Sequence, residues 1–276
     1  RVHRILAKYG AEGADDHLRK ADEAFKRALD INPDLSVAHN LYTNFEIESL
    51  GRAREAIIRL LGRVRSQAAD PELYAGLVTA CRFAGLLDAS LAAERHARRL
   101  DPSVRTSVMY THFMRGDWER AIETDTDDLR WITNWTLPVL GRRDEAIANY
   151  KRISQQRLPR VMLLMTTAAW QALEGRHDEA AATIREFCAR PFDPEGEYLV
   201  ARALLLIDEH AWAMDLFEHV IEAGFFCPQI LLCDPWLDPI RSDRRFNRIV
   251  ARARERSQEA EAEFRRLGGA QLLSLA

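Results

Sequence analysis

The feature that most constrains this chain is a glycine followed five residues later by a small residue, which recurs along most of its length. The marks are Gly51 with Ala56, Gly85 with Ser90, Gly116 with Ala121, Gly141 with Ala146 and Gly175 with Ala180, while Asp16 with Ala21 and Asp208 with Ala213 keep the spacing without the glycine. The step between successive marks is nearly constant, except that it shortens slightly before Gly116 and strongly before Gly141. A period of about 34 residues indicates stacked helix–turn–helix units.

The first unit shows how the cycle works. Ala21, Phe25 and Ala28 lie on one helical stripe, and Pro33 ends that helix because proline disfavours helical geometry in the residue before it. The next helix stops at Gly51, since glycine accepts left-handed backbone at a helix C-terminus. A small residue five positions later lets the two helices of a pair cross at the usual distance of about 8–10 Å.

This spacing resembles that of the tetratricopeptide repeat, whose unit of about 34 residues has small residues at the helix crossing and proline at its end. The resemblance covers roughly residues 14–224. It implies an all-α, right-handed superhelical solenoid of about seven antiparallel helix pairs over residues 1–224. Residues 225–276 are expected to form a C-terminal cap and a long helix.

The repeat is irregular at one place. The step from Gly116 to Gly141 is the shortest of the series, so the second helix of the fourth unit is expected to be short or fused into a tight turn. Asp125 stands where such repeats usually carry a bulky apolar residue. The superhelix is expected to bend here, where the aromatic residues between Tyr110 and Trp135 also gather.

The resemblance also predicts a binding surface, because the first helix of each pair lines the concave groove in this family. Carrying the groove positions across unit by unit gives Phe45, Glu48, Thr79, Arg82, Tyr110, Phe113, Trp131, Trp135, Met165 and Ala169. Aromatic anchors beside an arginine are common at binding hot spots. The alternative for the aromatic cluster is that it packs the irregular junction.

The segment after the last unit is interpreted as a cap. Trp236, Leu237 and Ile240 can plug the end of the solenoid, which terminal repeats need. Ser242 or Asp243 can then accept hydrogen bonds from the free backbone N–H groups of a helix over about residues 243–267.

The sequence indicates neither a metal site nor a nucleic-acid interface. Cys227, Cys233 and His219 lack the close spacing and second pair of a zinc site, so we expect no metal and no cofactor. In the final helix, Glu255 and Glu259 interleave with the arginines, and the net charge is −3. No continuous basic face results, so we expect no nucleic acid partner.

These observations predict a non-catalytic protein–protein interaction or scaffold module that binds a peptide or a partner domain in its groove. No nucleophile, paired-carboxylate or phosphate-loop motif is present, so we expect no enzyme. The alternatives are a small-ligand sensor or a regulatory tail, because the C-terminal segment is similar to the end of repeat arrays in bacterial signalling proteins. Those arrays accompany a serine/threonine kinase, an adenylate cyclase or a winged-helix domain.

The cellular location is inferred from two features. The chain has no run of about 18 apolar residues, so no membrane span is expected. Its four cysteines form no disulfide framework, which favours a reducing compartment. We expect a cytoplasmic protein, or an extracytoplasmic one if a membrane span precedes residue 1. The pattern starts in mid-helix, so we expect a piece of a longer protein.

Overall fold

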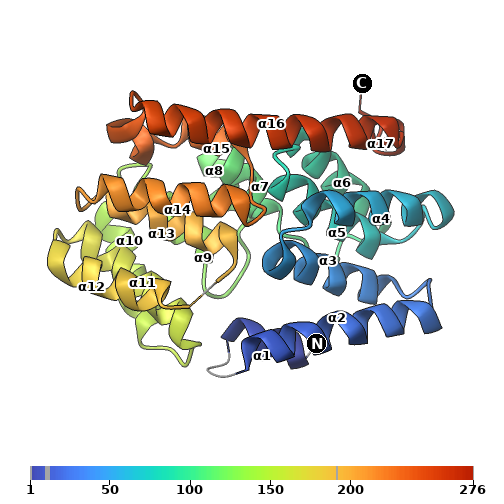
Figure 1. Ribbon diagram of the computed structural model, residues 1–276, viewed down its shortest axis with the longest axis horizontal. Helices are drawn as coiled ribbons and strands as arrows, with labels where there is room; N and C mark the ends of the chain where they lie inside the picture. Colours follow the sequence, from blue (N-terminus) through green and yellow to red (C-terminus); the bar gives the residue numbers. More distant parts are fainter. Residues whose placement is uncertain (1, 10–12, 191, 276) are drawn as a thin grey trace.

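The computed structural model describes residues 2–9, 13–190 and 192–275, and in these ranges it holds helices and no strands (Figure 1). The predicted all-α fold class is therefore confirmed. Within these ranges no helix is both long and apolar enough to cross a bilayer.

The helices pack against one another in consecutive pairs. They are α1 (Val2–Tyr9) with α2 (Ala14–Ile31), α3 (Ser36–Leu50) with α4 (Ala53–Ser66), α5 (Pro71–Phe83) with α6 (Leu87–Leu100), α7 (Val108–Arg115) with α8 (Trp118–Thr124), α9 (Trp131–Thr136) with α10 (Arg143–Ser154), α11 (Arg160–Leu173) with α12 (His177–Cys188), and α13 (Pro194–Leu205) with α14 (His210–Glu222). The C-terminal segment adds α15 (Pro228–Cys233), the 3₁₀ helix η1 (Pro235–Ile240), α16 (Arg244–Arg266) and α17 (Gly269–Leu272).

The turns within the pairs follow the sequence marks. The glycines with left-handed backbone at these turns are Gly51, Gly85, Gly116, Gly141 and Gly175. Asp208 adopts the same backbone, with φ of 61°, although it carries a side chain. The small residues five positions after the marks are all buried, which fits their place at the crossing of two helices.

The first pair departs from this pattern. The residue with left-handed backbone before α2 is Gly13, with φ of 68°. Asp16 lies inside α2, so the spacing mark places the first turn wrongly. The physical reason is that an aspartate near the start of a helix serves as a favourable first-turn acid rather than as a stop.

The fourth and fifth pairs are the irregular ones, as the short step from Gly116 to Gly141 predicts. The helices α8 and α9 have only seven and six residues. Asp125 is buried between them, and its Oδ2 accepts hydrogen bonds from the backbone N (2.8 Å) and Oγ1 (2.7 Å) of Thr133. The polar residue in an apolar position thus fixes the start of α9.

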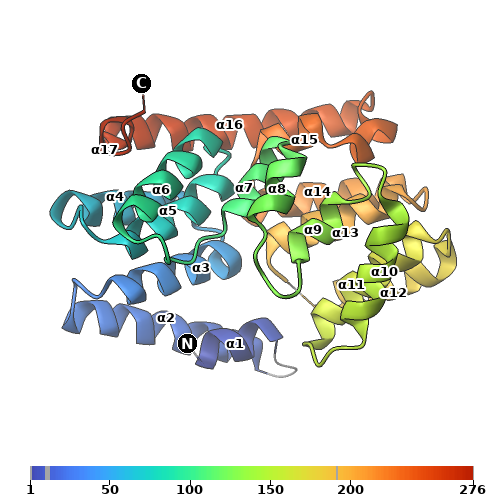
Figure 2. The ribbon, with the colours of Figure 1, turned by 180° about the vertical axis from the view of Figure 1, so that it is seen from behind.

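The C-terminal segment folds back over the early pairs. The backbone N of Phe226 donates to the carbonyl oxygen of Phe83 at 3.0 Å, and α16 contacts both α14 and α4. In Figures 1 and 2, α16 runs along one side of the molecule from the seventh pair to the second. As predicted, Trp236, Leu237 and Ile240 are buried, but this segment covers the flank of the array as well as its last pair.

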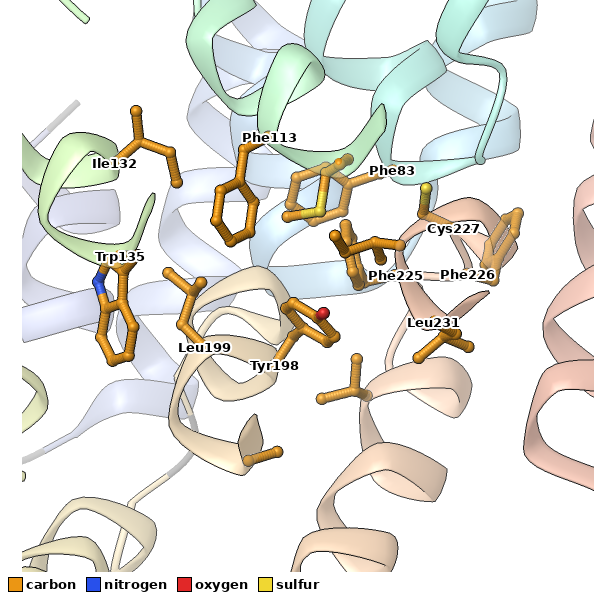
Figure 3. Close-up of a cluster of buried hydrophobic side chains, with 14 of the residues drawn as sticks. Phe83, Phe113, Ile132, Trp135, Tyr198, Leu199, Phe225, Phe226, Cys227 and Leu231 are labelled. Carbon is orange, nitrogen blue, oxygen red and sulfur yellow. The ribbon is translucent and has the colours of Figure 1, made fainter. Parts of the chain in front are cut away.

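One continuous hydrophobic core extends from Ile47 to Leu273. Figure 3 shows its centre, where aromatic side chains of several pairs meet the C-terminal segment. Phe83 and Phe225 make an edge-to-face contact with their ring centres 5.2 Å apart, and the ring centres of Tyr198 and Phe225 are 5.8 Å apart. The C-terminal segment, described to residue 275, therefore shares the core of the preceding helix pairs.

A buried ion pair anchors the C-terminal segment in this core. Arg202 of α13 and Asp234 are both fully buried, with Nε and Oδ2 2.6 Å apart. Asp234 also accepts from Tyr198 Oη at 2.7 Å and caps η1 through the backbone N of Trp236. Asp234 therefore joins α13 to η1, and it supplies the counter-charge that the buried guanidinium of Arg202 needs.

Candidate functional site

One cavity of the described part, with a volume of about 620 Å³, is formed by the first helices of the pairs. It is lined from α1, α3, α5, α11 and α13, from the first turns of α7 and α9, and from the residues that lead into these two helices. Side chains from all seven pairs therefore contribute to one space. A cavity of this size is within the range of about 300–1,000 Å³ that is typical of ligand sites.

Six of the predicted groove residues line this cavity. They are Glu48, Thr79, Arg82, Tyr110, Trp131 and Met165. The structure thus brings together residues that lie more than a hundred positions apart in the sequence.

The other predicted groove residues do not line the cavity, and this part of the prediction is wrong. Phe113, Trp135 and Ala169 are fully buried in the core, and Phe45 is fully buried in a smaller cluster with Phe25 and Tyr42. Phe113 packs edge-to-face on Trp118, and Trp135 packs likewise on Tyr150. The cavity reaches α7 and α9 at their first turns, so a side chain one turn further along is covered by neighbouring helices.

Arg82 is held in a buried bidentate ion pair on one wall of the cavity. Its Nε donates to Glu195 Oε1 at 2.7 Å and its Nη2 to Oε2 at 3.1 Å. Its Nη1 donates to Ser107 Oγ at 2.7 Å, and the guanidinium lies 5.2 Å from the ring centre of Tyr110. Glu195 is not among the residues predicted from the sequence, because a repeat period carries no information about a partner 113 residues away.

Tyr110 is a neutral group in this wall. Burial, with the nearby charge of Glu195 as a further cause, raises the pKa of its phenol well above the ordinary value. The ring therefore offers an aromatic face and an intact O–H group at neutral pH.

Lys8 lies in the cavity wall on its N-terminal side. Its Nζ lies 2.9 Å from Glu48 Oε2 and 3.0 Å from Asp193 Oδ2, and 5.0 Å from the ring centre of Phe192. Burial opposes the charge of the ammonium group, but the nearby carboxylates Asp193 and Glu48 outweigh it and raise the pKa above its usual value. This ion pair joins α1 to the start of α13 across the cavity.

The turn between α8 and α9 presents unpaired groups to the same cavity. Asp127 and Asp128 are exposed there, and their side chains form no hydrogen bond or ion pair with any described residue. The backbone N of Arg130 donates to Asp127 O at 2.8 Å and closes the turn. Trp131 follows directly and is half-buried.

The cysteines are packing residues. Burial raises the pKa of the Cys81 and Cys227 thiols to about 12, so both are protonated at neutral pH. His219 is paired with Glu197 at 3.3 Å rather than with Cys227 or Cys233. Among the residues that the structure describes, no three His, Cys, Asp or Glu side chains gather as a metal site would require.

Sequence comparisons add no functional assignment. The chain matches no protein-family model, and no curated protein is similar enough to count as a relative. Function is therefore inferred from the cavity and the residues that line it.

Proposed function

We propose that this chain is a non-catalytic interaction module of the tetratricopeptide class, with its pairs arranged as a superhelix around the cavity. Its function is to hold a segment of another polypeptide in that cavity. The single observation that carries this proposal is that side chains of all seven pairs converge on one space of about 620 Å³. Recognition through a helix-lined groove is a recurrent mode of peptide binding.

The character of the lining supports a peptide ligand. Trp131, Met162 and Met165 give apolar contact area, and methionine adapts to varied side chains. The amide of Asn44 lines the cavity and forms no hydrogen bond with any other described residue, so it can pair with a peptide backbone, which offers both donors and acceptors.

A second candidate function, a sensor for a small ligand, is favoured by the ion pair between Lys8 and Asp193. This pair lies in the cavity wall on its N-terminal side, so charged groups bound one end of the space, which suits a compact ligand better than an extended chain. A compound screen by thermal unfolding distinguishes the two candidates, because a small ligand that binds only the folded chain raises the Tm as its concentration increases.

The test of the leading proposal is a selection of phage-displayed random dodecapeptides on the purified chain. Peptides that occupy the cavity are expected to lose at least about tenfold in affinity for Trp131→Ala/Met162→Ala, because hot-spot truncations cost about 1–2 kcal/mol each. Trp212→Ala is the matched control, since Trp212 is half-buried on α14 and does not line the cavity. Circular dichroism checks that the variants are folded. Recovery of no peptide that responds to the cavity variant would overturn the proposal.

The wider setting is an expectation from the sequence resemblance. We propose that the module belongs to a larger signalling protein, since its C-terminal segment resembles the end of repeat arrays in such proteins. The gene sequence around this chain tests that directly, and a kinase, cyclase or winged-helix domain beside it would support the assignment.

A further inference from the structure

The cavity contains two sites where an aromatic ring and carboxylates together hold a cation of the chain itself. In the first, Lys8 lies over Phe192 and between Glu48 and Asp193. In the second, Arg82 lies over Tyr110 and pairs with Glu195. Both arrangements combine ring and carboxylate attraction for a positive charge.

A third set of the same chemistry lines the cavity without a cation. Trp131 and the carboxylates of Asp127 and Asp128 all line this space. None of these three side chains forms an ion pair or a cation–π contact with a Lys or Arg group within the described residues. We call Trp131, Asp127 and Asp128 the Trp131 site.

The charge of the lining also favours a positively charged occupant. Five carboxylates line the cavity against three cations, Lys8, Arg82 and Arg105, so its lining has a negative excess.

We propose that the Trp131 site binds a lysine or arginine side chain of the polypeptide held in the cavity. This inference rests on the proposed function and names the chemistry of its ligand. The ring of Trp131 offers its face to the cation, and the two aspartates at the turn supply the counter-charge. Neither Arg105 of the same lining nor Arg130 of the turn pairs with these two carboxylates; Arg130 donates to the carbonyl oxygen of Ile122 instead.

The same peptide selection tests the inference through the composition of the recovered peptides. Cavity-dependent peptides are expected to share a Lys or Arg residue, and replacing it by norleucine is expected to lower the affinity about tenfold. Asp127→Asn/Asp128→Asn is expected to cause a similar loss for the basic peptide and none for the norleucine peptide. Raising the salt concentration weakens the basic peptide alone.

The matched control is Glu55→Gln/Glu259→Gln, which removes two exposed charges that do not line the cavity and is expected to leave binding unchanged. Two negative outcomes are distinguishable. If peptides bind in a manner sensitive to Trp131→Ala/Met162→Ala but need no basic residue, the inference fails and the proposed function stands. If no peptide responds to that cavity variant, both fail.

Discussion

The glycine turns of the helix pairs form two groups that look alike in sequence and differ in what covers them. At Gly51, Gly85 and Gly116 the chain from Ala223 onward passes so closely that a Cβ atom on these residues would lie 2.6, 2.8 and 3.1 Å from its nearest neighbour there. At Gly141 and Gly175 a Cβ atom would meet nothing within 4 Å. All five have left-handed backbone, so the early turns need glycine for space as well as for conformation.

The difference shows that one local signal can serve two purposes. At each of these five turns the left-handed glycine follows the end of a helix. In the early pairs the missing side chain also lets residues 223–233 lie against the array. The difference between the two groups of turns therefore depends on the C-terminal segment being firmly held against the early pairs.

The anchor of the C-terminal segment is expected to give the largest effect. Asp234→Asn leaves the buried guanidinium of Arg202 without its counter-charge and is expected to cost about 3–5 kcal/mol of unfolding free energy. Urea denaturation measures the loss. Asp238→Asn is the control, since Asp238 pairs with Arg241 at the surface and exposed pairs contribute at most about 1 kcal/mol. Equal losses in the two variants would show that the buried pair does not anchor the segment.

The next largest effect is expected at a covered turn. In Gly51→Ala the new Cβ would meet the carbonyl oxygen of Ala223 at 2.6 Å. The expected loss is about 3 kcal/mol, combining the left-handed backbone penalty with the displacement of packed neighbours. Amide hydrogen exchange is also expected to quicken in α16. A protected α16 in a destabilised variant would mean that the segment does not depend on this contact.

An open turn is expected to be less sensitive. Gly175→Ala bears only the cost of left-handed backbone, about 1 kcal/mol, because its Cβ would contact nothing. Exchange in α16 should stay as in the parent chain. A loss from Gly175→Ala as large as that from Gly51→Ala would remove the distinction between the two groups.

The smallest effect is expected at the seventh turn, where an aspartate already has left-handed backbone. Asp208→Gly removes that strain but adds chain entropy to the unfolded state, so a gain of less than about 1 kcal/mol is expected. Thermal unfolding would show a slightly higher Tm. A clear loss would indicate that the Asp208 carboxylate, 3.9 Å from His210, stabilises the start of α14.

The sequence predicts the local parts of this molecule well. The helix ends at Gly51 and Gly175 and the burial of the small residues after them depend on backbone geometry and packing within one pair. Asp125 is a misfit for an apolar position in the sequence, and it proves to be a buried capping group. A polar residue at a core position is thus a readable sign of special local structure.

Contacts between distant pairs were not predictable from the period. A repeat describes how a unit meets its neighbours, whereas Arg82 pairs with Glu195 and Lys8 with Asp193 across the cavity. For the same reason, the period did not predict which of the groove positions line the cavity. Tyr110 and Phe113 are one turn apart on α7, yet Tyr110 lies in the cavity wall and Phe113 lies in the core. The neighbouring helices determine which of the two side chains is covered.

The return of the C-terminal segment has a consequence for the order in which the chain is made. Arg65 hydrogen-bonds to the carbonyl oxygen of Leu267, which lies 202 residues later. At the usual rate of synthesis, about 5–20 residues per second, Leu267 is made about 10–40 s after Arg65. During that interval the flank of the second pair is open to chaperones on the nascent chain. A ribosome that stops before residue 223 would release a protein whose early pairs stay uncovered.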